Sequence, residues 1–240
     1  RTFGWPPSGL TFEWWSRAWD NPGAREALLT SVQASLGATA IALVLGSMAA
    51  FAVARYRFFG RDVISILVVL PIALPGIVTG IALSNAITTT LQPFGIQFGM
   101  FTVIVGHATF CVVVVYNNVL ARLRRTGGSL EEASMDLGAN SWLTFRHVTF
   151  PTLRTALVAG ALLAFALSLD EIIVTTFTIG NEQTLPIWIF ANYARPNQLP
   201  IVNVVGVLVI LLSVIPVYLA SRLSQDPIGA RAGGAAAAAR

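Results

Sequence analysis

The chain has 240 residues and a formal net charge of +4; 55% of its side chains are hydrophobic, only 11% are charged, and its mean hydropathy is +0.71. A soluble chain normally carries about a quarter charged residues, so this composition indicates a membrane protein. Every basic residue is an Arg, and without the Lys of a Walker A motif the chain is excluded from the P-loop ATPases. The net positive charge is better explained by the orientation of the chain in a membrane than by nucleic-acid binding, and we expect no nucleic-acid partner.

Five apolar runs are each long enough to cross a bilayer as a helix, which takes about 20 residues. They predict five transmembrane helices, near Leu28–Val53, Val63–Ile87, Met100–Leu120, Ala156–Thr178 and Ile201–Ala220. The predicted fold class is therefore an all-α membrane protein, a polytopic helical bundle.

Arginines gather after the first and fifth runs and between the third and fourth runs. Positively charged loops stay in the cytoplasm, so these three regions are predicted to be cytoplasmic. Residues 1–27 then form an extracytoplasmic arm, residues 28–224 form the transmembrane domain, and the low-complexity residues 225–240 form a disordered tail.

Because the chain begins with Arg and shows no signal peptide, an outside start requires a cleaved signal or an earlier helix. We expect an earlier helix, which makes six in the intact protein and places both ends in the cytoplasm.

The arm is rich in tryptophan, with Trp5, Trp14, Trp15 and Trp19. Indole rings favour the headgroup region, where the ring stays apolar and the N–H stays wet. We expect these residues to anchor the arm along the outer interface; a cage around a solute is the competing interpretation.

A polar segment, Ser129–Leu153, separates the third and fourth runs. Ser129 and Glu132 have the spacing of a capping box, which starts a helix. Gly138 can adopt the left-handed conformation that ends a helix, and Pro151 is expected to prevent a helix from continuing through it. The pattern predicts a short helix of about two turns in a cytoplasmic loop, and such a helix suggests a docking surface.

Asp170 and Glu171 lie within the fourth apolar run. A carboxylate inside the bilayer costs about 2.5–3.5 kcal/mol, so an acid at this depth needs a reason. One interpretation is a step that attracts cations along a transport path. The other is an acid held by hydroxyl and backbone groups to fix helix packing.

Two prolines and two glycines interrupt the second run: Pro71, Pro75, Gly76 and Gly80. Each proline removes a backbone hydrogen bond and kinks a helix, and the freed carbonyls require cover by protein or water. The GIVTG sequence also matches GxxxG, which permits close helix contact. Both features place this helix at an interface, and lining the solute pathway is the more specific hypothesis.

His107 and Cys111 are four residues apart and share a helix face. Two ligands are too few for a metal site, so we expect no metal and interpret His107 as a buried histidine that is hydrogen-bonded to a neighbour. The sequence has no GxSxG or HExxH motif and no nucleophile beside a histidine, which argues against an intramembrane enzyme.

The polar loop carries Glu132-Ala133-Ser134, then Gly138, then Val148-x-Phe150-Pro151. This pattern resembles the EAA loop of ABC-importer permeases, which reads E-A-A, three residues, G, nine residues, I-x-L-P. Ser134 stands in place of the second Ala, and the apolar Val148 and Phe150 stand in place of Ile and Leu.

The resemblance extends from about Gly9 to Ser224. It is carried by Arg55–Arg61 (RYRFFGR), Gly106–Leu123 (GHATFCVVVVYNNVLARL), the EAA loop and Ser168–Phe190. Over this length the chain is similar to type I ABC-importer permeases of the spermidine/putrescine class, and more to the second permease subunit than to the first.

The resemblance implies a MetI-like fold in the bacterial inner membrane, with a cytoplasmic C-terminus and a coupling loop at about residues 124–153. It implies a heterodimer with a second permease subunit, two cytoplasmic ATPases that use ATP and Mg, and an extracytoplasmic solute-binding protein. The chain itself is expected to be non-catalytic and to bind no cofactor. The implied ATPase-coupling residues are Glu131, Glu132, Ala133, Ser134, Asp136, Gly138 and Pro151. The candidate solute pathway comprises Asp170, Glu171, Pro75, Gly76 and Gly80.

Three alternatives remain open from the sequence. Within the importer class, the solute could be an amino acid, an opine, an aminophosphonate or a ferric ion. Outside it, a channel or carrier that works without an ATPase accounts for the kinked and acidic spans but not for the capped loop helix. A membrane scaffold accounts for the loop but not for acids within the bilayer.

Overall fold

The apolar runs form long helices in the computed structural model, which describes residues 11–224. Four of these helices are long and apolar enough to cross a membrane, and a fifth span is reached if the bent pair α3 and α4 counts as one. The elements in chain order are α1 (Glu13–Trp19), α2 (Pro22–Arg55), α3 (Arg61–Ala73), α4 (Gly76–Thr90), η1 (Gln92–Phe94), α5 (Met100–Thr126), α6 (Ser129–Asp136), α7 (Ser141–Thr144), η2 (Phe145–Thr149), α8 (Phe150–Leu169), α9 (Ile173–Thr178), α10 (Leu185–Asn192) and α11 (Leu199–Ser224). The predicted all-α helical bundle is confirmed.

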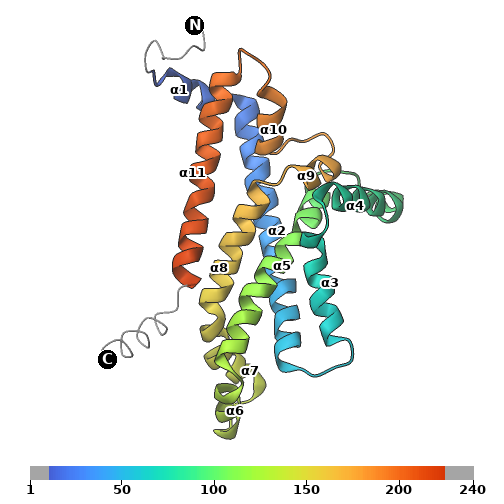
Figure 1. Ribbon diagram of the computed structural model, residues 1–240, viewed down its shortest axis with the longest axis vertical. Coiled ribbons are helices and arrows are strands. Elements are labelled where there is room, and N and C mark those ends of the chain that lie inside the picture. Colours follow the sequence, from blue (N-terminus) through green and yellow to red (C-terminus); the bar gives the residue numbers. More distant parts are fainter. Residues whose placement is uncertain (1–10, 225–240) are drawn as a thin grey trace, which may run out of the picture.

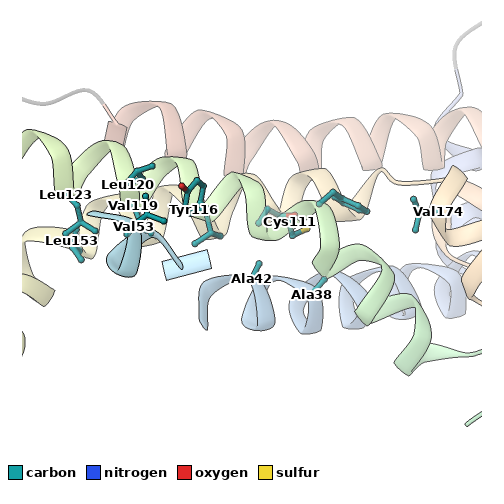
Figure 2. Close-up of a cluster of buried hydrophobic side chains, with 14 residues drawn as sticks. Ala38, Ala42, Val53, Cys111, Tyr116, Val119, Leu120, Leu123, Leu153 and Val174 are labelled. Carbon is teal, nitrogen blue, oxygen red and sulfur yellow. Dashed lines mark hydrogen bonds between the residues drawn. The ribbon is translucent and has the colours of Figure 1, made fainter. Parts of the chain in front are cut away.

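The centre of the bundle is the contact between α2 and α5, with α8 packed on both and α11 on α8 (Figure 1). Small residues of α2, among them Ala38 and Ala42, face larger side chains such as Tyr116 across this contact (Figure 2). At Gly46 a Cβ would lie 2.8 Å from the carbonyl oxygen of Val112. Small residues let transmembrane helices approach closely, and this approach fixes how α2 and α5 are placed.

The second predicted span, Val63–Ile87, is not one kinked helix. It consists of α3 and α4, which are bent by 108° relative to one another (Figure 1). Leu74 ends α3 in an extended conformation, with ψ of 147°, because the following Pro75 disfavours the helical region for its predecessor. The break at Pro75 therefore redirects the chain, which a kink at Pro71 alone would not do.

The fourth predicted span, Ala156–Thr178, is wrong at its C-terminal end. Helix α8 ends at Leu169, and α9 begins at Ile173. Asp170 is the C-cap residue of α8, and Glu171 Oε1 accepts a hydrogen bond from the backbone N–H of Val174 at 3.0 Å. Because the Glu171 carboxylate caps the start of α9, it competes with continuation of α8, and this competition explains the break. The two acids therefore lie at a helix break and not inside a continuous span.

Pro151 does not block the helix that precedes it, contrary to the prediction. Residues Ser141–Leu169 form one continuous helical span that contains a π-helical turn, η2. In that turn the Phe150 N–H bonds to the Phe145 carbonyl, five residues back. The wider turn accommodates Pro151, which lies in the first turn of α8, where the N–H that proline lacks is not needed.

The end of the bundle opposite α6 holds α1 and α10 (Figure 1). Ala18 of α1 is buried in a cluster with Trp188 of α10 and Val202 of α11. The guanidinium of Arg17 lies 4.8 Å from the centre of the Trp14 ring. Helix α2 begins at Pro22, earlier than the predicted Leu28. The predictions for Trp5 and for the tail, residues 225–240, lie outside the described residues.

Candidate coupling loop and solute pathway

Helix α6 ends where the sequence predicts it, at Gly138. This glycine has a φ of +90°, and its N–H donates to the Met135 carbonyl at 2.9 Å. The next N–H, that of Ala139, reaches back to the Ser134 carbonyl at 3.1 Å. These two bonds make a Schellman motif, in which a residue at positive φ satisfies the last carbonyls of a helix. The predicted helix and its stop are confirmed.

The predicted capping box at Ser129 and Glu132 is wrong. The N-cap residue is Gly128, and no side chain caps the helix. Because α6 starts one residue before the predicted position, Ser129 is inside the first turn and cannot act as the cap. The carboxylates of Glu131 and Glu132 lie in that first turn, where the positive end of the helix dipole favours negative charge.

The remainder of the loop is ordered by short polar contacts. The Asn140 side chain accepts a hydrogen bond from the Leu143 N–H at 2.9 Å and caps α7. The hydroxyls of Ser134 and Thr144 lie 3.1 Å apart, which ties α6 to α7. The serine at the second Ala position of the EAA pattern therefore contributes a hydrogen bond that an alanine could not make.

The exposed surface of the loop combines acidic and apolar side chains. Glu132, Ala133 and Asp136 are exposed. In the same loop, Leu137 is 90% exposed and Trp142 is 65% exposed. Exposed apolar side chains gathered among polar ones are typical of a protein interaction surface. We refer to Glu132, Ala133, Asp136, Leu137 and Trp142 as the docking face.

Glu131 does not belong to the docking face. Its carboxylate accepts two hydrogen bonds from Arg55, at 2.9 and 3.0 Å, on the inner side of α6. In the sequence, Arg55 indicates membrane orientation and belongs to the RYRFFGR segment of the family resemblance, and neither feature points to Glu131. The pair is separated by 76 positions in the chain, so no local pattern could have identified it.

Helix α4 packs against α9 through the predicted GxxxG glycines. A Cβ at Gly76 would lie 3.5 Å from Ile173, and one at Gly80 would lie 2.5 Å from Phe177 Cδ2. Pro75 is the N-cap residue of α4, and its carbonyl accepts the N–H of Val78 at 2.9 Å. The expected interface at this helix is confirmed, and its partner within the chain is the short helix after the two acids.

The two acids differ in environment. Asp170 is exposed and makes no side-chain hydrogen bond within the described residues, whereas Glu171 is half-buried and bonded to the start of α9. Both line an open groove of about 420 Å³ between α8 and α11. The buried Ser213 hydroxyl lines the same groove and finds no hydrogen-bond partner within residues 11–224. The structure thus assigns a capping role to Glu171 and leaves Asp170 facing the groove.

The predicted pathway residues form two groups and not one lining. Asp170 and Glu171 line the groove, and none of Pro75, Gly76 and Gly80 does so. Gly76 and Gly80 of the second group instead contact α9, which begins two residues after Glu171 in the chain. A movement of α9 would therefore affect both groups.

His107 is a buried histidine that bridges two helices, as expected. Its Nδ1 lies 2.7 Å from the Ser168 hydroxyl, and its Nε2 lies 2.8 Å from the Thr175 hydroxyl. The Cys111 thiol donates to the Ala164 carbonyl at 3.4 Å. Residues 11–224 contain no group of three or more His, Cys, Asp and Glu side chains that could hold a metal ion.

Comparison with known proteins agrees with this geometry. The family described as binding-protein-dependent transport system inner membrane component matches residues 42–231. The putrescine transport system permease protein PotI of Escherichia coli strain K12 is 32% identical over 227 residues, which cover 89% of this chain and 80% of PotI. The spermidine/putrescine transport system permease protein PotC of Haemophilus influenzae is 29% identical over 218 residues, which cover 90% of this chain and 83% of PotC.

Two solved structures share the fold. One is an amino acid ABC transporter with histidines, at a TM-score of 0.65 and 15% identity, covering 90% of this chain and 99% of the other. The second is a bacterial ABC transporter involved in the import of the acidic polysaccharide alginate, at a TM-score of 0.64 and 17% identity, covering 90% of this chain and 79% of the other. The predicted MetI-like ABC-importer fold is confirmed, and the chain belongs to the family of inner membrane components of binding-protein-dependent transport systems.

Proposed function

We propose that this permease carries a polyamine, spermidine or putrescine, into the cell. The observation that carries the proposal is the 32% identity to a putrescine permease over 89% of the chain. Asp170 adds chemical support, because a polyamine is a chain of ammonium groups and an exposed carboxylate beside an apolar groove attracts such groups.

The docking face is proposed to bind a cytoplasmic ATPase. A short helix that ends in a Schellman motif and is tied to α7 through Ser134, with acidic and apolar side chains outward, fits into a groove of a partner protein. In this proposal Glu132, Ala133 and Asp136 contact the ATPase. Ser134, Gly138 and Pro151 instead shape the loop that presents them.

The complete importer is proposed to hold this chain, a second permease subunit, two ATPases and an extracytoplasmic solute-binding protein. ATP and Mg belong to the ATPases, and this chain supplies no catalytic group and binds no cofactor. The docking face and the C-terminus then lie on the cytoplasmic side of the inner membrane, and residues 1–27 lie on the outer side as an arm before the transmembrane domain, residues 28–224.

The proposal is tested by transport in proteoliposomes that contain this chain with its second permease and ATPases. Labelled spermidine and putrescine are supplied with the binding protein, and uptake is measured with and without ATP. We expect saturable uptake that requires both ATP and the binding protein. Stimulation of ATP hydrolysis by the binding protein without polyamine uptake would exclude the polyamine and leave an amino acid, opine, aminophosphonate or ferric ion as the solute.

Asp170→Asn tests the role given to the groove. Removing the negative charge is expected to raise the polyamine concentration for half-maximal uptake about tenfold, which corresponds to about 1.4 kcal/mol of lost attraction. Asp62→Asn is the matched control, because Asp62 is an exposed acid in the first turn of α3, away from the groove. Equal behaviour of the two variants would remove Asp170 from the pathway.

A further inference from the structure

An ion pair joins the end of α2 to the inner side of α6. Arg55 Nε lies 2.9 Å from one carboxylate oxygen of Glu131, and a second guanidinium nitrogen lies 3.0 Å from the other oxygen. The two side chains are only 17% and 15% exposed. A two-point contact between guanidinium and carboxylate fixes orientation as well as distance, which a single hydrogen bond does not do.

The same two side chains hold two further elements. Arg55 donates to the carbonyls of Leu123, at 3.3 Å, and Gly127, at 2.7 Å, at the end of α5. Glu131 accepts a hydrogen bond at 3.2 Å from the Thr149 hydroxyl, at the end of η2 and the start of α8. The ends of α2, α5 and α8 therefore meet α6 at one ion pair.

The connection of α6 to α5 is weak apart from this ion pair. No residue of α6 is buried, so the helix has no apolar side chain locked into the core. Its covalent link to α5 passes through Gly127 and Gly128, and Gly127 has a φ of +62°. A glycine pair is a soft joint, because it lacks side chains that restrict the backbone. Such a joint transmits force poorly.

We propose that Arg55 and Glu131 are positioning residues that transmit the displacement of α6 to the membrane spans. The inference rests on the proposed docking of an ATPase at α6, and it assigns different roles to two neighbouring acids. Glu132 faces outward and contacts the ATPase, whereas Glu131 faces inward and ties α6 to α2. Arg55 and Glu131 touch neither ATP nor solute.

The test uses the complete importer in proteoliposomes with Arg55→Gln, Glu131→Gln and the double variant. The measured quantity is the number of ATP molecules hydrolysed per solute molecule imported, for complexes in which the ATPases still co-purify. We expect each single variant to raise this ratio about fivefold or more, at the lower end of the range that coupling between sites spans. The double variant is expected to match the singles, because both substitutions break the same contact.

Two substitutions serve as controls. Arg57→Gln removes an exposed arginine two positions from Arg55 and is expected to leave the ratio unchanged. Glu132→Gln is expected to lower co-purification of the ATPases, since it alters the docking face. If Glu132→Gln has no effect on assembly while the Arg55 and Glu131 variants raise the ratio, the docking role given to Glu132 fails and the role of the ion pair stands.

A purely structural ion pair gives a different result. In that case Arg55→Gln and Glu131→Gln lower the unfolding temperature of the permease, but each assembled complex imports with the unmodified ratio, and this outcome overturns the proposal. If Glu131→Gln does not assemble, Thr149→Val removes only the hydrogen bond to Glu131, and Arg55→Lys keeps the charge but loses the two-point contact. An unmodified ratio in both of these variants likewise overturns it.

Discussion

Gly80 of α4 lies directly against the ring of Phe177 of α9. A Cβ at this glycine would be 2.5 Å from Cδ2 and 3.2 Å from Cγ of the ring. The contact joins the helix that begins after the break at Pro75 to the helix that begins after the acids. Helices α4 and α9 thus form one packed unit beside the long spans (Figure 1).

Gly80→Leu is expected to separate α4 from α9 and to reduce uptake. The added side chain collides with the Phe177 ring, and overpacking of this kind costs about 1–3 kcal/mol. Uptake per assembled complex is the measurement. The double variant Gly80→Leu/Phe177→Ala frees the space and should recover part of the activity. Gly206→Leu is the control, since a Cβ there meets nothing within 4 Å; equal losses at Gly80 and Gly206 would contradict the packing argument.

His107→Leu is expected to destabilise the permease by about 1–3 kcal/mol, the cost of leaving buried polar groups without partners. The substitution removes the bridge between the Ser168 and Thr175 hydroxyls. Thermal unfolding of the purified protein measures the effect. The triple variant His107→Leu/Ser168→Ala/Thr175→Val, which removes the stranded hydroxyls too, should be more stable than His107→Leu alone.

A metal at His107 would lead to another pattern. The unfolding temperature of the unmodified protein would then fall in the presence of a chelator. Our interpretation of His107 as a bridge between helices requires that temperature to stay constant.

The parts of the fold that depend on local sequence could be predicted. Long apolar runs gave α2, α5 and α11, because a helix is the one way for a single segment to satisfy its backbone in lipid. The end of α6 at Gly138 was predictable for a similar reason, since glycine is the residue that adopts positive φ without strain.

The errors arose where hydropathy or spacing cannot separate two structures. Asp170 and Glu171 sit between apolar residues on both sides, so hydropathy averaged over the run conceals the helix break at these two acids, between α8 and α9. The capping-box spacing at Ser129 fits a helix that starts one residue later than α6 does. Pro75 predicts a break in the helix, but the 108° angle between α3 and α4 and the packing of α4 on α9 are tertiary features that the spacing of prolines and glycines does not encode.

The Arg55–Glu131 pair illustrates a second limit. The contact spans 76 positions and joins a residue at the end of one membrane helix to a residue in a loop helix. In the sequence, neither Arg55 nor Glu131 differs from an ordinary surface charge. Only the tertiary arrangement brings the two side chains together.

Gly138→Val is expected to uncouple ATP hydrolysis from transport or to block assembly with the ATPases. A Cβ at Gly138 meets nothing within 4 Å, so the effect comes from the backbone conformation and not from a collision. Holding a residue with a side chain at a left-handed φ costs about 1–2 kcal/mol. Gly138→Asn is the control, because asparagine adopts this conformation more readily. The ratio of hydrolysis to uptake distinguishes them, and coupled transport by Gly138→Val at the unmodified ratio would contradict the role of this turn.

Glu171→Ala is expected to lower the stability of the permease by about 1 kcal/mol through loss of a helix cap. Glu171→Gln retains an oxygen that can accept the Val174 N–H and should be closer to the unmodified protein. Thermal unfolding of both variants is the measurement. A larger loss for Glu171→Gln than for Glu171→Ala would indicate that the charge, and not the cap, is what matters at this position.

Cross-linking tests directly whether the docking face contacts the ATPase. Ala133 is exposed on that face, so Ala133→Cys in membranes should cross-link to the ATPase subunit. Leu29→Cys places an exposed cysteine near the start of α2, far along that helix from α6, and should not. The unmodified chain, in which the sole cysteine Cys111 is buried, serves as background. Cross-linking from Ala133→Cys alone is the predicted result; cross-linking from that variant no stronger than from Leu29→Cys would contradict the account.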